Sequence, residues 1–379
     1  MDYVFRYSDA RAEVDDFSFA TGLPIDNLIR ANLSRQFYNR VQLTNFAVDG
    51  LVEQRVGFNL TDYNRKDTDP GPFSPPQFLG QTREVDYQAN LLLTENNTFT
   101  AGALYHQEDA STTFDPQAVL NNKAAYLQDQ IRLFDRWTTN VGVRWDDYNR
   151  FGPAQTYRVS SIYNLDETNT AFHASLGTSF RAPALAESLF AFGNPHLLPE
   201  HSKGWDAGVR QRLLDGAITF DATYFRNDLQ NLIVFDFNTF SLQNVGRART
   251  SGVEFTGTCN VTQGMTLTGN YTFTDTLNLD NGGPLLRRPR DKAQVGIDQL
   301  FWNNRARVGL YANLVGQRLD TGNNVLRRYS VINVNGRYQW SERVELFARI
   351  DNVFNERYEE VRGFGVPGVS GYGGATLTW

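Results

Sequence analysis

Apolar and polar residues alternate one by one over many segments of this chain. In residues 265–274, for example, the odd positions carry apolar side chains or glycine and every even position carries threonine or asparagine. The same alternation recurs at residues 137–146, 305–314 and 343–351. Successive side chains of a β-strand point to opposite faces, so a period of two predicts strands with one apolar and one polar face. No stretch of comparable length keeps helical spacing, and we expect an all-β fold.

The alternation extends along the whole sequence of 379 residues. It predicts about 18 strands. They are expected at residues 1–10, 34–48, 51–65, 82–93, 98–109, 121–133, 137–149, 155–164, 170–181, 200–212, 217–228, 246–259, 265–276, 288–301, 305–318, 327–339, 344–353 and 370–379.

Short and long connections are expected to alternate between these strands. Short turns are predicted at 49–50, 95–97, 134–136, 165–169, 213–216, 260–264, 302–304 and 340–343, and long connections at 66–81, 182–199, 229–245 and 354–369, among others. In an antiparallel meander this alternation puts every short turn at one end and every long loop at the other, as in outer-membrane barrels. A soluble β-sandwich has no reason to keep it.

Several large aromatic residues lie at or beside the predicted short turns: Phe134, Trp137, Trp302 and Trp340. Aromatic side chains at one end of a barrel are typical of a membrane interface. For any single ring, ordinary core packing is the alternative. The last predicted strand ends in aromatic Trp379, and we take Leu377 and Trp379 as a candidate assembly signal.

Composition excludes several other classes of protein. No segment approaches the run of about 18 apolar residues that a membrane-spanning helix needs. The net charge of −6 gives no basic face for nucleic acid, and the single cysteine, Cys259, cannot form an internal disulfide or a thiolate cluster. The four histidines show no metal-ligand spacing, and no phosphate loop or catalytic motif is present, so we expect neither a cofactor nor an enzyme.

Acidic pairs raise the question of a calcium site. Asp15 and Asp16, Asp67 and Asp69, and Asp146 and Asp147 are adjacent or nearly so. Calcium loops need several oxygen ligands at set spacing with a turn glycine, which these pairs lack. Solvated charge is the better interpretation.

A sheet of this kind in a membrane has to close. An unpaired edge in lipid would leave backbone groups without hydrogen bonds, at several kcal/mol each. An even number of strands can close as an antiparallel up-and-down transmembrane β-barrel, whose lumen would be wide and either water-filled or plugged.

Several motifs resemble those of the TonB-dependent outer-membrane receptors. They are SFRAP at residues 179–183, GNPHLLPE at 193–200 followed by SK at 202–203, NVGRARTSGVE at 244–254 and DNVFNERY at 351–358. Within that family the chain is most similar to the cobalamin receptors, through YFRNDL at 224–229, LIVF at 232–235, LRRPR at 286–290 and YEEV with GFGVPG at 358–368. Siderophore receptors share parts of these motifs, so a siderophore-iron receptor stays open as an alternative.

The resemblance implies a bacterial outer-membrane barrel of about 22 strands closed by an amino-terminal plug. About 18 strands are predicted, so residues 1–379 are expected to be the barrel domain without the plug, about four first strands and the signal peptide. The implied partners are the TonB complex, outer-membrane lipid and lipopolysaccharide, and a scarce metal-containing ligand, cobalamin first. Since the plug contacts TonB, we expect this chain alone not to be a competent active transporter.

Ligand contacts in such receptors come from the long loops. Arg287 and Arg288 follow the loop at 277–286, so the fork-like guanidinium groups are expected at the outer rim, where they could contact phosphate and amide groups of a ligand. Lipopolysaccharide contact or a solvated rim is the alternative. Phe235, Phe237 and Phe240 could pack a ligand or fold their own loop.

Two rivals remain. One is a passive porin-like pore, and the other is a soluble all-β module that binds sugars. The soluble alternative requires the apolar faces, for example Leu267, Leu310 and Leu346, to line a sealed core.

Overall fold

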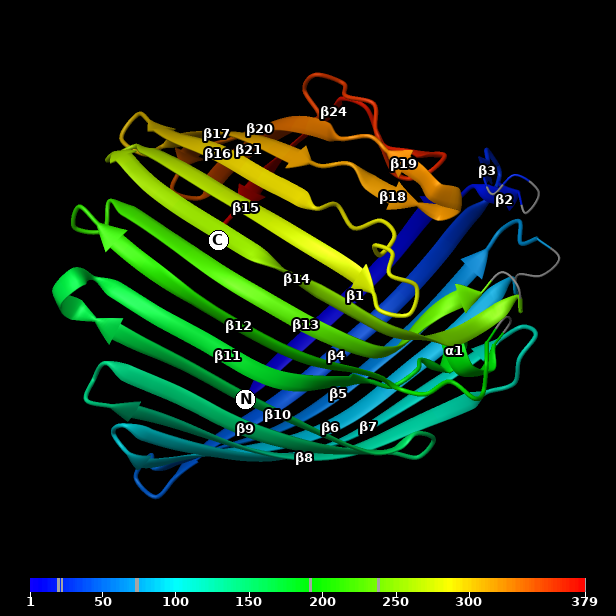
Figure 1. Ribbon diagram of the computed structural model, residues 1–379, viewed down its shortest axis with the longest axis horizontal. Coiled ribbons are helices and arrows are strands. Elements are labelled where there is room, and N and C mark those ends of the chain that lie inside the picture. The colour runs from blue at the N-terminus through cyan, green and yellow to red at the C-terminus, as the bar shows by residue number, and fades with distance from the viewer. Residues whose placement is uncertain (19–20, 22, 72–74, 191–192, 237–238, 379) are drawn as a thin grey trace. The chain divides into compact units, whose positions relative to one another are not determined.

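The protein consists almost entirely of β-strands. The computed structural model describes residues 1–379 apart from 19–20, 22, 72–74, 191–192, 237–238 and 379. Over the described residues there are 24 strands, one short α-helix and two 3-10 helices. Eighteen of the strands belong to one sheet, and the other six form three two-stranded ribbons. The long strands are drawn as arrows in Figure 1. The prediction of an all-β, up-and-down antiparallel fold is confirmed. None of the helices in the described part of the chain is both long and apolar enough to span a membrane.

The chain divides into two compact units. Unit 1 comprises Met1–Ser161, Ser175–Gly204 and Asp228–Arg247, and unit 2 comprises Ile162–Ala174, Trp205–Asn227 and Ala248–Trp379. Five strands are divided between the two units: β10 (Gly152–Leu165), β11 (Thr170–Arg181), β12 (Glu200–Leu213), β13 (Ile218–Asp236) and β14 (Ser241–Thr262). The 3-10 helix η1 (Asp166–Thr168) follows β10, and α1 (Leu185–Leu189) follows β11.

Unit 1 contains an antiparallel meander. Its long strands are β1 (Asp2–Glu13), β4 (Ala31–Ala47), β5 (Val52–Asp67), β6 (Gln77–Thr94), β7 (Asn97–Thr112), β8 (Ala118–Leu133) and β9 (Trp137–Tyr148), each paired with the next. The short strands β2 (Asp16–Ser18) and β3 (Leu23–Ile25) form a separate two-stranded ribbon. The turn between β4 and β5 contains Gly50 at φ +87°, a conformation that glycine adopts without steric cost.

Unit 2 repeats this arrangement. Its long strands after β14 are β15 (Met265–Asn278), β16 (Asp291–Phe301), β17 (Ala306–Val315), β20 (Tyr329–Ser341), β21 (Val344–Asp351) and β24 (Ser370–Leu377). They pair antiparallel in chain order and run from yellow to red in Figure 1. Two ribbons stand in the long connections, β18 (Arg318–Asp320) with β19 (Asn324–Leu326) around η2 (Thr321–Asn323), and β22 (Glu359–Val361) with β23 (Phe364–Gly365).

The registers give the sheet of unit 2 two chemically different faces. One row of directly opposed residues is apolar across five strands: Leu267, Ile297, Leu310, Val334 and Ile350. The adjacent row carries Thr266, Asp298, Gly309, Asn335 and Arg349. Directly opposed residues share a face, so the alternation of the sequence becomes a continuous apolar surface backed by a polar one.

The apolar face is not buried. Leu310 and Leu346 are 43% and 40% exposed, and Leu267 is half-buried. Over the described residues, the buried apolar side chains number only ten, five of them alanines. An apolar surface of this extent requires an apolar surrounding. The arrangement that a soluble module would need, with these leucines in a sealed core, is therefore absent from the described residues.

The predicted long connection at residues 229–245 is wrong. β13 continues to Asp236 and β14 begins at Ser241, so most of that segment is strand. Residues 232–235 are Leu, Ile, Val and Phe, whose high strand propensity is consistent with this extension. The connection at 149–151 is also short, so long and short connections do not alternate strictly.

Candidate ligand-binding site

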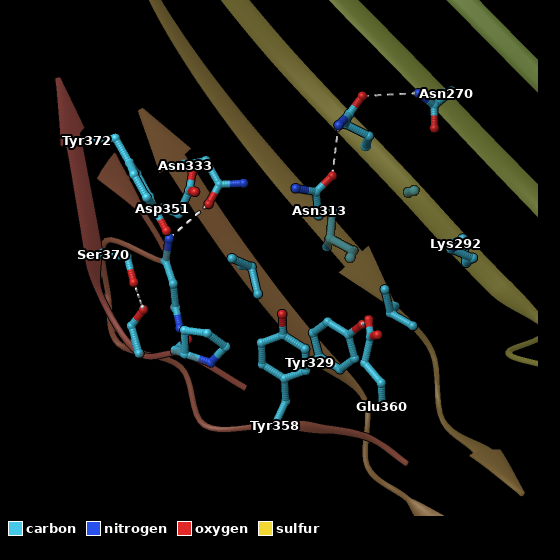
Figure 2. Close-up of a pocket in the computed structure, with 18 residues that line it drawn as sticks. Asn270, Lys292, Asn313, Tyr329, Asn333, Asp351, Tyr358, Glu360, Ser370 and Tyr372 are labelled. Carbon is cyan, nitrogen blue, oxygen red and sulfur yellow. Dashed lines mark hydrogen bonds between the residues drawn. The ribbon is translucent and has the colours of Figure 1, made fainter. Parts of the chain in front are cut away.

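A pocket of about 600 Å³ lies in unit 2 at the strand ends that carry long connections (Figure 2). Asn270 of β15, Gln294 of β16 and Asn313 of β17 lie directly opposite one another on its wall. Asn270 Nδ2 donates to Gln294 Oε1 at 3.4 Å, and Gln294 Nε2 donates to Asn313 Oδ1 at 2.8 Å. A side-chain amide has two donors and two acceptor lone pairs, so this amide row keeps capacity for a polar ligand.

A pair of tyrosines forms another part of the wall. The rings of Tyr329 and Tyr358 are stacked, with centroids 3.9 Å apart and planes at 19°. The Tyr329 hydroxyl donates to Glu360 Oε1 at 3.2 Å, and the Arg318 guanidinium carbon lies 5.4 Å from the Tyr329 centroid. Burial raises the pKa of Tyr358, and the nearby Glu360 carboxylate raises that pKa further. These contacts fix an aromatic platform that can pack against a ligand (Figure 2).

Arg318 supports this platform from inside the protein. It is 6% exposed, and its Nη2 donates to the Glu359 carbonyl oxygen at 2.6 Å. Within the described part of the chain, its Nη1 is buried without a hydrogen-bond partner. The guanidinium therefore holds the backbone of the connection after β21 against Tyr329.

One buried carboxylate joins the three long connections of unit 2, at residues 279–290, 316–328 and 352–369. Asp320 is 0% exposed and accepts hydrogen bonds from Arg287 Nε at 2.7 Å, the Thr321 amide at 2.7 Å and the Arg362 amide at 2.8 Å. Burial alone raises the pKa of Asp320, but the bonds from the Arg362 and Thr321 amides and from Arg287 outweigh it, so the pKa lies below its ordinary value. Asp320 stays ionised and binds the loops together.

The motif at residues 351–358 shapes the connection after β21. Asn352 is buried; its Nδ2 donates to the Glu356 carbonyl oxygen at 2.9 Å, and its Oδ1 accepts from the Glu356 amide at 2.8 Å. Its own amide donates to Asn333 Oδ1, which lines the pocket, at 2.8 Å. Asn352 and Asn355 both have positive φ, which asparagine tolerates better than most residues. The motif thereby fixes the loop beside the pocket.

The motifs of unit 1 have a comparable structural role. Arg181 pairs with Glu187 at 2.8 Å and Glu200 at 2.7 Å, and Glu200 also accepts from the Ile233 amide at 2.8 Å. Asn244 exchanges two hydrogen bonds with the backbone of Leu198, at 2.7 and 2.9 Å. These contacts hold the connection between β11 and β12 against the ends of β13 and β14.

The two arginines predicted to contact ligand lie in the connection at residues 279–290. Arg287 has φ +57° and is committed to Asp320, while Arg288 is exposed and its Nη1 lies 3.4 Å from the Arg287 carbonyl oxygen. Neither lines the pocket of about 600 Å³. Phe235 packs edge-on against Phe240 with centroids 5.5 Å apart, as a loop folded on itself would require. Phe237 lies outside the described residues.

The predicted interface aromatics lie beside short turns. Phe134, Trp137, Trp302 and Trp340 are all exposed, and Tyr338 packs edge-on against both Trp302 and Trp340. Leu377 is the exposed last residue of β24. Trp379 lies outside the described residues.

The acidic pairs are not simply solvated charge. Asp67 is buried and Arg30 binds it at 2.7 Å while also binding Asp16 at 2.6 Å; Asp146 is buried and pairs with Arg144 at 2.8 Å. The expectation of solvated pairs is wrong for these three aspartates, because arginines distant in sequence or on the same strand face neutralise them. Among the described residues, no three His, Cys, Asp or Glu side chains gather as metal ligands would.

The chain belongs to the TonB-dependent receptor-like β-barrel family, whose model matches residues 2–353. The protein is thus a barrel of the bacterial outer membrane.

Solved structures share its fold at low identity. The siderophore receptor PirA from Pseudomonas aeruginosa is 19% identical, with a TM-score of 0.75, over 93% of this chain and 65% of that one. The FrpB iron transporter from Neisseria meningitidis is 13% identical, with a TM-score of 0.81, over 99% of this chain and 68% of that one. The copper transporter OprC is 15% identical, with a TM-score of 0.78, over 100% of this chain and 76% of that one. This chain spans 62–65% of the length of three of these proteins: PirA from Pseudomonas aeruginosa, PirA from Acinetobacter baumannii and the ferric enterobactin receptor PfeA from Pseudomonas aeruginosa.

Proposed function

We propose that this protein is the barrel part of a receptor that takes up a scarce metal-containing ligand, with cobalamin as the first candidate. The observation that carries the proposal is the pocket of about 600 Å³ at the long-loop end of a sheet whose other face is apolar. In a membrane barrel with a pocket at its long-loop end, the ligand would bind in this pocket before it is transported. The proposal assigns the chain no catalytic step.

The lining of the pocket supports cobalamin, a ligand with amide and phosphate groups. The amide row and Asn333 can exchange hydrogen bonds with amides of a ligand, and the tyrosine platform offers apolar contact. Lys292, Asp351 and Glu360 are the charged side chains of the wall, which leaves a formal charge of −1. A polyanionic ligand would meet net repulsion there.

A ferric siderophore is the second candidate. A siderophore receptor, a ferric enterobactin receptor and an iron transporter share the fold, and the family motifs of this chain do not separate the two ligand classes. The charge of the pocket favours an uncharged iron chelate over a polyanionic one such as ferric enterobactin.

The TonB complex would energise transport by the complete receptor. We propose, from the family resemblance, that a plug and about four further strands complete residues 1–379. On this proposal the chain alone binds ligand without pumping it. Energy-coupled uptake by this chain in proteoliposomes that contain the TonB complex would contradict it. A large steady conductance in planar bilayers would favour the passive pore instead.

The ligand is tested by equilibrium binding to the chain purified in detergent, with cyanocobalamin, an uncharged ferric trihydroxamate and ferric enterobactin as probes. We expect cyanocobalamin to bind and the Asn313→Leu variant to bind it roughly tenfold more weakly, since about one hydrogen bond is lost. Asn335→Leu is the matched control, because Asn335 lies on the same polar face outside the pocket. No binding of any probe, or equal effects of the two variants, would contradict the assignment.

A further inference from the structure

A second pocket, of about 750 Å³, lies beside the first in unit 2 and has a different lining. Arg327 and Arg328, at the end of the connection before β20, and Arg357, in the connection after β21, all line it. Tyr358 and Gly368 line both pockets, so the two are adjacent. The aromatic platform therefore stands between an amide-lined space and an arginine-lined space.

The three arginines have no structural contact that would account for them. Over the described residues, none has an ion-pair partner within 4.0 Å or a side-chain hydrogen bond, and all three are exposed. Two other arginines of these connections are engaged, in contrast: Arg287 binds Asp320, and Arg318 binds the Glu359 carbonyl oxygen. The guanidinium forks of the arginine pocket are thus available for a ligand.

The charge of the arginine pocket favours an anion. Glu356 and Glu359 also line it, so three guanidinium groups face two carboxylates and one net positive charge remains. The whole chain, in contrast, carries a net charge of −6. Guanidinium forks match the paired oxygens of phosphate and carboxylate groups, which they bind through parallel hydrogen bonds.

We propose that Arg327, Arg328 and Arg357 form a subsite for a phosphate or carboxylate group of the ligand whose amide-bearing part occupies the adjacent pocket. The inference rests on the proposed function, since it assigns the anion to the transported ligand. It narrows the ligand to a molecule with hydrogen-bonding amides or hydroxyls on one side and an oxyanion on another. A phosphate of a membrane lipid has the same chemistry and is the competing source.

The subsite is tested with pyrophosphate as the probe and the full chain folded in detergent. Isothermal titration is expected to give saturable binding that the variant R327Q/R328Q/R357Q weakens roughly tenfold or more, as the loss of charge-assisted bonds implies. The matched control R288Q/R290Q/R362Q removes the same charge from arginines that do not line the arginine pocket. The control is expected to bind pyrophosphate within about twofold of the unmodified chain, since its three arginines do not line the arginine pocket and their exposed charges are screened by salt. Equal losses in both variants, or no pyrophosphate binding, overturn the proposal.

Two further titrations separate the sources of the anion and the two levels of inference. If cyanocobalamin binding falls in R327Q/R328Q/R357Q and not in the control, the subsite belongs to the ligand, as proposed. If only binding of lipid A in mixed micelles falls, the subsite serves lipid and the proposal is overturned. Normal cyanocobalamin binding by both variants overturns the subsite alone. A further outcome is that no metal-containing probe binds to the unmodified chain, while R327Q/R328Q/R357Q alone loses pyrophosphate binding. This outcome supports the anion site and refutes the proposed function.

Discussion

At the scale of single residues, Asp320 is the group on which the long connections of unit 2 most depend. Its carboxylate has no exposed surface and accepts hydrogen bonds from side-chain and backbone donors of three connections. A buried carboxylate needs such donors, because burial without them would neutralise it. The residue therefore positions the loops beside the pocket and does not itself contact a ligand.

Replacing this carboxylate should loosen the loops without unfolding the barrel. For Asp320→Asn we expect a local loss of about 1–3 kcal/mol, since Arg287 and two amides lose a charged acceptor. Limited proteolysis should then cut within residues 279–290 or 352–369 faster than in the unmodified chain. Asp275→Asn is the control, because its 3.7 Å pair with Arg290 is exposed. Cleavage that rises equally in both variants would argue against this role.

The same contact predicts a pH dependence. The pKa of Asp320 is depressed by folding, so its stabilising effect is complete above the unfolded pKa of about 3.9 and is lost as the pH falls through the folded value. Hydrogen exchange of the Thr321 and Arg362 amides, corrected for intrinsic rates, should show equal protection at pH 7 and about pH 5 and lower protection below about pH 4. A fall in protection already between pH 7 and pH 5 would contradict the assignment.

The family motifs contain some residues of this site, but none of these was predicted to bind ligand. Asn352 and Tyr358 lie in the motif at 351–358, because the local shape of that loop depends on its own residues. Asp320 carried no signal, since two of its three donors come from residues 33 and 42 positions away. Arg287 and Arg327 look alike in sequence, as the first of two adjacent arginines, and only the fold separates the arginine bound to Asp320 from the one that is free.

At the scale of strands, close approach of neighbouring backbones explains one motif glycine. Gly252 of β14 lies opposite Thr274 of β15, and a Cβ at Gly252 would overlap the backbone carbonyl oxygen of Phe273. A backbone atom cannot move aside as a flexible side chain can. The glycine of the motif at 244–254 is therefore required by strand packing in unit 2.

We expect Gly252→Ala to destabilise the barrel by about 1–3 kcal/mol, the usual cost of overpacking. The measurement is the urea midpoint of the detergent-folded chain, followed by the mobility difference between heated and unheated samples. Gly257→Ala in the same strand is the control, since its Cβ would meet only the Thr219 carbonyl oxygen at 3.9 Å. Equal urea midpoints for the two variants would mean that the backbones of β14 and β15 can move apart at Gly252, and the prediction would be wrong.

Some strands with one apolar face were predicted closely, while others, such as β13, extend up to eight residues beyond the predicted bounds. The segments at 265–276 and 344–353 match β15 and β21 to within about two residues, because alternation fixes a two-faced strand. The small ribbons β18–β19 and β22–β23 were not predicted, since they are too short for a period to register. Their pairing depends on loop contacts such as those of Asp320.

At the scale of the whole molecule, the account rests on which medium each face meets. Large apolar side chains are exposed along unit 2, whereas the opposite face carries the amide row and charged pairs such as Arg307 with Asp298 at 2.7 Å. A protein with these faces is stable only where hydrocarbon covers the first and water or ligand meets the second.

The most direct test is the accessibility of spin labels in lipid bilayers. Cys259 is the single cysteine, so a Cys259→Ser background allows labels at Leu310→Cys and Asn335→Cys, on opposite faces of neighbouring strands. We predict that the label at position 310 collides mainly with dissolved oxygen, and the label at 335 mainly with a water-soluble nickel chelate. A label at 310 shielded from both reagents would mean that this face packs inside protein, and the membrane-barrel account would be wrong.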